Sequence, residues 1–364
     1  MTASPIPDLP VGFDTAWLTA LLQDSGTLPA SNRVAEVTRT QVGDGTGMMS
    51  ELSRLEVTYA EPHTALPASF IAKYASQNAT NREVAMSFNL YERETRYFAE
   101  LDPRTEAVTP EIYVSRVEGD RFIILMQDMG DYRVGDQAVG ADLAETEVAV
   151  DELAKLHGAF WNQVQDIDWV PHIARSYHAD NMYNFTAAGW GNMCQLFGDF
   201  LSPAIAARGE QFHGALRGLQ TVMDTPPITL IHGDFRMENL MFGTAPAHAG
   251  VAILDWQGPL LGCGLVDVAL MLAQSTRTDV RRSHERALIE RYVAGLAAVG
   301  VSGYDSDTAW HHYRQALLYN WCYVAVVAGT LDASNERAFR WMSQMVARQS
   351  AASEDLDVFD QLPA

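Results

Sequence analysis

The spacing of apolar positions changes between two periods in the first part of the chain. Residues 14–24 repeat their apolar positions with the period of a helix, whereas residues 33–75 alternate with a period of two, which predicts three antiparallel strands. A helix is expected at 82–101, and two further strands are expected to form a hairpin that turns at 118–120. The pattern therefore predicts a β-rich first lobe, residues 1–129, with five strands and one main helix.

The remainder of the chain, residues 130–364, is predicted to be mostly helical. Residues 141–161 carry one apolar stripe, and helical periodicity returns in 264–275 and 311–331. Short strands are expected only around 228–255. The boundary between the lobes falls at the polar segment MQDMG, where the fifth predicted strand ends. We expect an α+β protein with a small sheet lobe and a larger helical lobe.

Charge and cysteine content narrow the possible functions. The formal net charge is −21, so the chain lacks the basic face that nucleic acid binding needs. Its three cysteines have no zinc-type spacing and favour a reducing compartment, the cytoplasm. The N-terminal sequence lacks the features of a signal peptide, and the most apolar segment, 317–331, is shorter than the roughly 20 residues of a spanning helix. We expect no membrane span, and the oligomeric state cannot be predicted.

Two polar stretches at the ends of predicted strands carry candidate chemistry. In residues 230–243, Asp234 follows one apolar run, and Asn239 precedes the next. A carboxylate in this place can take the proton of an attacking hydroxyl while the amide oxygen holds a metal. Asp255 ends the apolar run VAILD and is a second candidate ligand for Mg²⁺. Either stretch alone is also typical of an ordinary polar turn.

Taken together, the two stretches resemble a phosphotransferase family that includes aminoglycoside phosphotransferases, choline-kinase-like enzymes and, more closely, ecdysteroid-kinase-like small-molecule kinases. The family pattern is His-Gly-Asp, four residues, Asn, and then an apolar strand that ends in Asp; residues 232–234, Asn239 and Asp255 match it. The likeness extends through 153–161 and 267–272. It implies a protein-kinase-like bilobal fold, ATP and Mg²⁺ as cofactors, and a small-molecule hydroxyl as the phosphate acceptor.

The implied fold requires a strand lysine that is paired with a helix glutamate. Of the 25 basic residues only Lys73 and Lys155 are lysines, and Lys73 lies in the middle of the predicted strand FIAKYA. Glu94 falls on the apolar stripe of the next helix, where an unpaired carboxylate would be costly to bury. We expect a salt bridge between Lys73 and Glu94, while Glu92 points towards solvent.

The loop VGDGTGMMS is the candidate phosphate-binding loop, because glycines let backbone N–H groups approach phosphates. A glycine-rich hairpin turn is the alternative, and neither a P-loop nor a Rossmann motif is present. The glycines concerned are Gly43, Gly45 and Gly47. By resemblance, the segment after the fifth strand receives the adenine through its backbone; its residues are Met126, Gln127, Asp128 and Met129.

Other motif residues are expected to support the site. The resemblance implies that Asp267 holds the backbone of the catalytic loop, and His157 and His232 are interpreted as structural histidines. The chain has Gly262-Cys263 where family members often have Gly-Asp, so the role of this segment stays open.

The hypothetical mechanism has Lys73 and the glycine loop on the ATP phosphates, Asn239 and Asp255 on Mg²⁺, and Asp234 on the acceptor hydroxyl. Residues 160–200 hold nine aromatic residues and four carboxylates. This composition favours an apolar or aromatic alcohol, sterol-like or acyl-linked, over a polycationic aminoglycoside. Alternatively, the aromatic residues only fill the helical core.

Four other functions remain to be weighed. An aminoglycoside- or amino-alcohol-type kinase would share every motif above. A protein kinase is disfavoured because no Asp-Phe-Gly or Ala-Pro-Glu segment follows the catalytic loop. A pseudokinase scaffold would bind nucleotide with little catalysis. A hydrolase with Asp234 as its nucleophile would form a phosphoenzyme.

Overall fold

The structure is a computed structural model, and it divides into two compact units. It describes residues 5–8, 10–43, 49–62, 66–225 and 227–362. The first unit consists of Met1–Arg104, Thr109–Asp131 and Asp255–Gln257. The second consists of Thr105–Val108, Tyr132–Leu254 and Gly258–Ala364.

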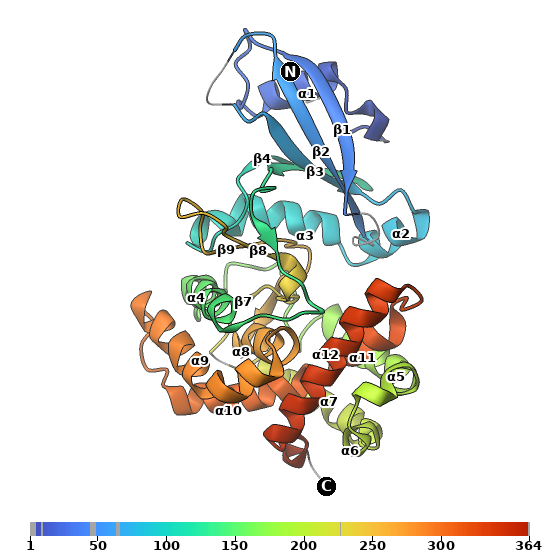
Figure 1. The fold of residues 1–364 in the computed structure, drawn as a ribbon, viewed down its shortest axis with the longest axis vertical. Coiled ribbons are helices and arrows are strands. Elements are labelled where there is room, and N and C mark those ends of the chain that lie inside the picture. Colours follow the sequence, from blue (N-terminus) through green and yellow to red (C-terminus); the bar gives the residue numbers. More distant parts are fainter. Residues whose placement is uncertain (1–4, 9, 44–48, 63–65, 226, 363–364) are drawn as a thin grey trace. The chain divides into compact units, whose positions relative to one another are not determined.

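The first unit is built on a five-stranded antiparallel sheet (Figure 1). Its strands are β1 (Val34–Val42), β2 (Ser50–Tyr59), β3 (Ser69–Ala75), β4 (Ile112–Glu118) and β5 (Arg121–Gln127). Their order is β1-β2-β3-β5-β4, so β3 is the central strand. β4 and β5 form the predicted hairpin, and Gly119 supplies the left-handed backbone of its turn with φ +64°. The predicted five strands are confirmed.

Helix α1 (Thr15–Asp24) covers part of this sheet. Its N-terminus is capped by Asp14, whose side chain accepts the N–H of Trp17 at 2.8 Å. Its apolar face joins a core cluster with Leu55 of β2 and Phe70 of β3. The helix residues in that cluster are Leu18, Leu21 and Leu22.

The main helix expected at 82–101 is interrupted. The chain forms α2 (Ala79–Ser87), then α3 (Leu90–Arg96), and continues as a wider π-type turn over Tyr97–Leu101. Asn89 separates α2 from α3 because its backbone is left-handed, with φ +54°, and this conformation ends the regular ladder of helical hydrogen bonds. Periodicity alone did not reveal the break, since the apolar stripe continues across it.

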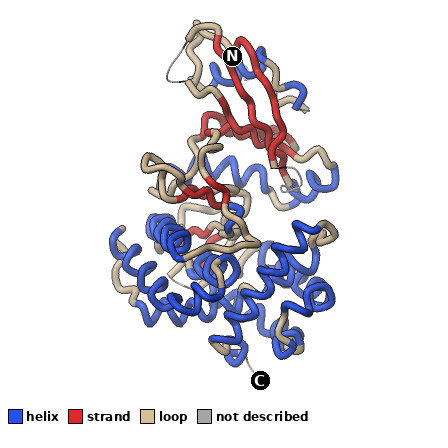
Figure 2. Tube along the Cα trace, viewed as in Figure 1, coloured by secondary structure: helices blue, strands red, loops and turns tan. Residues whose placement is uncertain are grey.

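The second unit is mostly helical (Figure 2). Its helices are α4 (Leu143–Ala159), α5 (Tyr177–Phe197), α6 (Pro203–Ala206), α7 (Gly209–Met223), α8 (Leu265–Leu270), α9 (Thr278–Ala298), α10 (Ser306–Tyr319), α11 (Trp321–Thr330) and α12 (Glu336–Asp355). Its short strands are β6 (Arg133–Val134), β7 (Thr229–Ile231), β8 (Leu240–Phe242), β9 (Val251–Ile253) and β10 (Leu260–Gly262). β7 pairs with β10, and β8 lies between β6 and β9.

The helical expectations for this unit hold with two changes. α4 begins at a capping box, in which Asp142 accepts the N–H of Glu145 and the Glu145 side chain accepts the N–H of Asp142. The helix expected at 311–331 is divided at Asn320 into α10 and α11, and the segment at 264–275 ends in a π-type turn. Within the described part of the chain, no helix combines the length and the apolar character needed to cross a membrane.

Candidate active site

Lys73 lies on the central strand of the sheet in the first unit. It is in the middle of β3, where its backbone is opposite Leu52 of β2 and Ile124 of β5. Its Nζ donates to Glu94 Oε1 at 2.7 Å and to Asp255 Oδ1 at 2.8 Å. The expected salt bridge to Glu94 is confirmed, and the same ammonium group also bridges to the carboxylate of Asp255.

Burial and charge determine the protonation of this cluster. The side chains of Lys73 and Glu94 are 8% and 2% exposed. Burial lowers the pKa of Lys73, but the charges of Asp255 and Glu94 outweigh this effect, and the pKa lies above its ordinary value. Burial raises the pKa of Glu94 to about 6, although the ammonium of Lys73 acts in the opposite direction. Lys73 is therefore a fixed positive charge, whereas Glu92 is exposed, as expected.

Asp255 is held in an uncommon backbone conformation. Its φ is +63°, in the left-handed region that costs a non-glycine residue about 1–2 kcal/mol. Its Oδ1 accepts from Lys73, and its Oδ2 accepts from Gln257 Nε2 at 3.2 Å. The next residue, Trp256, is fully buried and stacks on the ring of Tyr97. This strain at a carboxylate is typical of functional positions.

The segment predicted to receive the adenine, 126–129, comprises the last two residues of β5 and the two that follow. The carboxylate of Asp128 accepts from Arg54 Nε at 2.7 Å and Nη2 at 3.1 Å, and from the N–H of Gly130 at 3.0 Å. The N–H of Gln127 donates to Glu111 O at 2.8 Å and is therefore used within the sheet. Met129 is buried, and Met126 and Gln127 are partly exposed. The roles of these four residues in base binding stay predictions.

Part of the glycine loop lies outside the described residues, including Gly45 and Gly47. Gly43, at the end of β1, has φ +72°, a conformation that favours glycine.

The second unit carries residues 234–239, which are predicted to be catalytic and are called the catalytic turn. Asp267 on α8 is fully buried and holds the backbone that leads into this turn. Its Oδ2 accepts the N–H of His232 at 2.6 Å, and its Oδ1 accepts the N–H of Gly233 at 3.0 Å. The expected role of Asp267 is confirmed.

Both histidines that were interpreted as structural are buried and hydrogen-bonded. His232 Nδ1 accepts the N–H of Asp234 at 3.2 Å, and its Nε2 therefore carries the proton that it donates to Leu254 O at 2.8 Å. His157 lies between Tyr292 Oη at 2.9 Å and Asp267 Oδ2 at 3.3 Å. Both predictions are confirmed.

Asp234 and Asn239 are in direct contact. Asn239 Nδ2 donates to Asp234 O at 2.8 Å and to Asp234 Oδ2 at 3.0 Å. Because the amide nitrogen is used in this way, Oδ1 is the atom of Asn239 that can face a metal. The Asp234 side chain is 47% exposed and thus open to a substrate.

Arginines balance the acids beside the catalytic turn. Arg236 Nε donates to Asp234 Oδ2 at 3.2 Å, and its Nη1 donates to Glu238 at 2.7 Å. Arg337 on α12 pairs with the other oxygen of Glu238 at 3.4 Å. Trp341, one helical turn further on, lies under the guanidinium of Arg236, with 5.0 Å between the guanidinium carbon and the ring centroid. These neighbours give the turn paired charges and one aromatic face.

The aromatic residues at 160–200 differ in burial, and two of the nine lie in the buried core. Phe160 and Phe197 are fully buried, and Trp190 packs against Phe212 of α7 and Trp321 of α11. Tyr177 and Phe185 on α5 are each 41% exposed. The partly exposed aromatic residues of this range are Trp161, Trp169, Tyr183, Trp190 and Phe200.

The segment that departs from the family pattern is also structural. Cys263 is buried after β10, and its N–H donates to Met223 O at 2.7 Å. Burial raises the pKa of its thiol to about 12, so it stays protonated at neutral pH.

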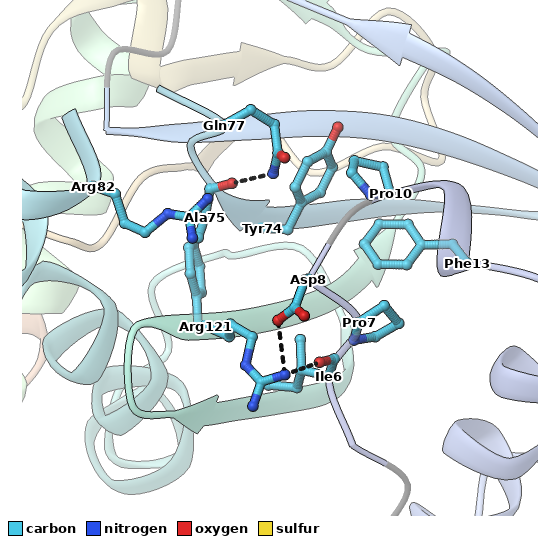
Figure 3. Close-up of a pocket in the computed structure, with 11 residues that line it drawn as sticks. Ile6, Pro7, Asp8, Pro10, Phe13, Tyr74, Ala75, Gln77, Arg82 and Arg121 are labelled. Atoms are coloured by element: carbon cyan, nitrogen blue, oxygen red, sulfur yellow. Dashed lines mark hydrogen bonds and ion pairs between the residues drawn. The ribbon is translucent and has the colours of Figure 1, made fainter. Parts of the chain in front are cut away.

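A small recess in the first unit is lined by residues of the N-terminal segment, β3, α2 and β5 (Figure 3). The N-terminal segment closes it, because Arg121 Nη1 donates to Ile6 O at 2.9 Å and pairs with Asp8 at 3.0 Å. None of the predicted site residues lines it.

The structure thus brings together Lys73, Glu94 and Asp255 in the first unit, and Asp234 and Asn239 in the second. Sequence reasoning missed three kinds of contact: the second partner of Lys73, the Asp128–Arg54 pair, and the α12 residues beside the catalytic turn. No local pattern signals them, because their partners lie tens of residues or more away in the sequence.

Comparison with protein families gives a match over most of the chain. The family model described as the Ecdysteroid kinase-like family matches residues 44–300. A comparison with curated proteins finds no match.

Several solved structures share the fold at low sequence identity. A choline kinase from Cryptosporidium parvum Iowa II has 9% identity and a TM-score of 0.53, with 88% of this chain and 90% of that chain covered. A microcompartment-associated aminopropanol kinase has 13% identity and a TM-score of 0.54, with 88% and 93% covered. The GDP complex of aminoglycoside 2'-phosphotransferase-IIIa has 12% identity and a TM-score of 0.51, with 95% and 99% covered. These likenesses confirm the predicted kinase-like α+β fold.

Proposed function

The chain belongs to the ecdysteroid kinase-like family, and from this premise we propose that it transfers the γ-phosphate of ATP to the hydroxyl of a small apolar or aromatic alcohol, sterol-like or acyl-linked. The coarse activity follows from the family: the chain is a small-molecule kinase, a phosphotransferase with an alcohol group as acceptor. The nucleotide, the metal and the type of alcohol are the proposal.

One observation carries the proposal, the buried ammonium of Lys73 between Glu94 and Asp255. Burying the charges of Lys73 and Glu94 is unfavourable unless they are paired, and the partly exposed carboxylate of Asp255 adds a second partner for Lys73. The arrangement holds a compact cation in a fixed place. Phosphoryl transfer depends on such fixed charges, because it requires positioning and electrostatic stabilisation more than covalent chemistry. We assign Lys73 to the ATP phosphates and Glu94 to the orientation of Lys73.

The remaining nucleotide contacts are assigned by position. We assign the phosphates to the backbone N–H groups of Gly43, Gly45 and Gly47. The adenine is assigned to the segment 126–129. The Arg54–Asp128 pair supports this segment, since it anchors the backbone just beyond β5.

Asp234 is the proposed general base. Its Oδ2 is held by Asn239 and Arg236, so we assign Oδ1 to the acceptor hydroxyl. Oδ1 takes the hydroxyl proton while the acceptor oxygen forms a bond to the γ-phosphorus. The bond from that phosphorus to the β,γ-bridging oxygen breaks, and ADP leaves with the electron pair.

The donor chemistry fits Mg²⁺. Asn239 Oδ1 and the carboxylate of Asp255 are hard oxygen ligands, and Mg²⁺ is commonly held by one or two protein ligands together with water and phosphate oxygens. No cluster of three His, Cys, Asp or Glu side chains suited to a metal occurs among the described residues. When bound, Mg²⁺ supplies positive charge to the phosphate oxygens. Within the second unit, the N–H of Leu254 donates to Asn239 O at 2.8 Å and so fixes the backbone of this candidate ligand.

The charges beside Asp234 favour a neutral acceptor. Glu238 accepts from both Arg236 and Arg337, and Asp234 accepts from Arg236, so these carboxylates are already compensated. A polycationic acceptor is better bound by uncompensated acids. The ring of Trp341 adds an apolar surface near the turn. The acceptor class is therefore an uncharged alcohol with apolar or aromatic parts.

A cationic amino alcohol or aminoglycoside is the second candidate. The fold is shared with a choline kinase, an aminopropanol kinase and an aminoglycoside phosphotransferase. A weakly catalytic nucleotide-binding scaffold is the third candidate, and the combination of Lys73, Glu94, Asp234, Asn239 and Asp255 counts against it.

The three cysteines are free, which suits the reducing cytoplasm that we propose as the compartment.

The test is a screen for acceptor-dependent ADP release from Mg·ATP. Sterols, aromatic alcohols and acyl-linked alcohols form one arm, and amino alcohols and aminoglycosides form the other. Asp234→Asn should lower the turnover number with the best acceptor by about 100-fold or more, because general-base catalysis contributes about 10²–10⁴-fold. Its matched control is Asp180→Asn, an exposed carboxylate of α5 paired with Arg217, which should keep wild-type turnover.

Each outcome separates the candidates. ADP release with the neutral arm supports the proposal, and release only with the cationic arm assigns the second candidate. Near-wild-type turnover of Asp234→Asn would refute the role of Asp234. Nucleotide binding without turnover in either arm would favour the scaffold.

A further inference from the structure

Gln137 is a buried side chain bound to the back of the catalytic turn. It is 1% exposed and precedes α4 by several residues. Its Oε1 accepts the N–H of Met237 at 3.0 Å and the hydroxyl of Ser275 at 3.0 Å, and its Nε2 donates to Gln274 O at 2.9 Å. All three partners of the Gln137 side chain lie in the second unit, and one of them, Met237, lies within the catalytic turn.

The position of Met237 gives this contact its importance. It opens the short 3₁₀ turn Met237–Asn239, which follows Asp234 and ends at the candidate metal ligand. Met237 is itself 1% exposed, so its N–H has no access to bulk water. A buried N–H without an acceptor is unfavourable, and Gln137 satisfies the N–H of Met237 in one geometry of the turn.

The backbone next to Gln137 also fits closely against the turn. The N–H of Gly135 donates to Leu240 O at 2.9 Å, immediately after the turn. A Cβ atom on Gly135 would overlap the carbonyl oxygen of Met237. The segment that carries Gln137 therefore contacts the catalytic turn through both its backbone and its side chain.

Arg348, on the long helix α12, holds the segment that carries Gln137. It is 5% exposed, and its Nη1 donates to Gln137 O at 2.6 Å. Its Nη2 donates to Ala138 O at 3.0 Å and Val139 O at 2.9 Å. Burial lowers the pKa of Arg348 to about 10, while Asp136 acts in the opposite direction, so the guanidinium stays charged at neutral pH. A charged group that donates to three successive carbonyls leaves the segment little freedom.

We propose that Gln137 is a positioning residue of the catalytic turn, and that Arg348 holds Gln137 in place so that α12 supports the geometry of Asp234 and Asn239. The contact to Met237 is independent of any assigned activity, whereas its catalytic consequence rests on the function proposed above. Small displacements of a reacting group can reduce the rate by about 100-fold, which is the effect that a loosened turn would have.

The experiment that tests the contact is hydrogen exchange of the full-length protein without nucleotide. Gln137→Met keeps the length of the side chain but removes the acceptor for the N–H of Met237. Amide exchange in peptides covering 230–243 should become at least about ten-fold faster, because a buried hydrogen bond is lost. Gln137→Asn, which leaves a shorter amide in the same place, should act in the same direction if the methionine variant does not fold.

The matched control is Gln220→Met. Gln220 is also 1% exposed, and its Nε2 donates to a backbone carbonyl, that of Ala179 at 2.8 Å. It lies on α7 and bonds to α5, so its replacement should leave exchange at 230–243 unchanged. Arg348→Met should accelerate exchange in the same peptides through loss of the support of Gln137.

The second measurement is the basal hydrolysis of Mg·ATP, with water as the acceptor. Gln137→Met should lower kcat by about 10- to 100-fold, while KM for ATP changes less than about two-fold, because the variant affects the turn and not the nucleotide contacts of the first unit. A merely destabilising substitution would not produce this split, and Gln220→Met should not show it.

Each combination of the exchange and kinetic results supports the proposal or overturns it. Faster exchange at 230–243 together with a selective loss of kcat supports the proposal. Unchanged exchange in Gln137→Met overturns it, and so does faster exchange with an unchanged kcat. If the wild-type protein hydrolyses no ATP, the proposed function is in question, whereas the exchange result still decides whether Gln137 holds the turn.

Discussion

The rings of Tyr97 and Trp256 stack with 3.7 Å between their centroids and 5° between their planes. Both side chains are fully buried. Tyr97 follows Glu94 by three residues, and Trp256 directly follows Asp255, so the stack ties together the two backbone segments whose carboxylates share Lys73. An apolar contact thus holds the charged cluster in place, because the stacked rings leave the two segments little room to separate.

Replacing this stack should destabilise the protein strongly. Trp256→Leu removes a large buried ring and should lower the free energy of unfolding by about 3 kcal/mol, within the range for large-to-small core changes. Tyr97→Phe is the control, because it keeps the stacked ring and removes only the hydroxyl. Urea denaturation of the variants measures both effects. A Trp256→Leu protein as stable as Tyr97→Phe would show that the stack contributes little.

The two lysines provide a matched pair. Lys73→Met should lower kcat/KM for ATP by about 100-fold, because it removes a fixed positive charge from the proposed phosphate site. Lys155→Met is the control, since Lys155 lies on α4 and pairs with Glu152 at 2.5 Å. Acceptor-dependent ADP release measures both variants. Equal losses in the two variants would contradict a specific role for Lys73.

Activity should depend on the protonation of Glu94. With its pKa at about 6, Glu94 loses its charge as the pH falls through that value, and the pair with Lys73 weakens. KM for ATP should therefore rise below about pH 6 in the wild-type protein. Glu94→Gln should show no such rise, and a KM profile identical to that of the wild type would exclude Glu94 as its cause.

Protonation of Glu94 should affect the stability of the protein in the opposite direction from its effect on activity. Because the pKa of about 6 lies above the ordinary 4.5, the folded protein binds this proton more readily than the unfolded chain does between these values. The contribution of Glu94 to the free energy of unfolding should therefore decrease as the pH rises from 4.5 to 6. The difference between wild type and Glu94→Gln in denaturant titrations across this range measures it, and a difference that grows with pH would contradict the sign.

Two glycines with similar left-handed backbones allow the energetic cost of backbone strain to be measured apart from the cost of steric overlap. Gly233 has φ +83° and Gly303 has φ +75°. A Cβ atom on Gly233 would overlap the carbonyl oxygen of Gly258, whereas one on Gly303 would meet nothing within 4 Å. Gly303→Ala should cost about 1 kcal/mol from backbone strain alone. Gly233→Ala should cost clearly more, as measured by thermal or chemical unfolding, and equal costs would show that the backbone near Gly258 adapts.

Much of the local structure was predictable because it depends on short-range periodicity. The alternation of apolar residues specified the strands of the first sheet, since one face of each strand must be buried. The pairing of Lys73 with Glu94 was expected because the family resemblance implies a strand lysine paired with a helix glutamate, and a carboxylate on the apolar stripe of a helix requires a cation.

Other features could not be predicted from local patterns. The apolar stripe runs unbroken past Asn89, so only the structure reveals the left-handed residue that separates α2 from α3. Nothing in the run VAILDWQ indicates that Asp255 adopts positive φ and shares Lys73 with Glu94.

The sequence by itself determined which residue types are available for phosphoryl transfer and which secondary structure carries them, because these depend on residue identity and on periods of two to four residues. Only the tertiary structure decided which distant side chains support them. Gln137 reaches Met237 across 100 positions, and Arg348 reaches Gln137 across 211. Such contacts arise from buried polar groups that must find partners once the chain is packed, and residue spacing does not encode which partner each group finds.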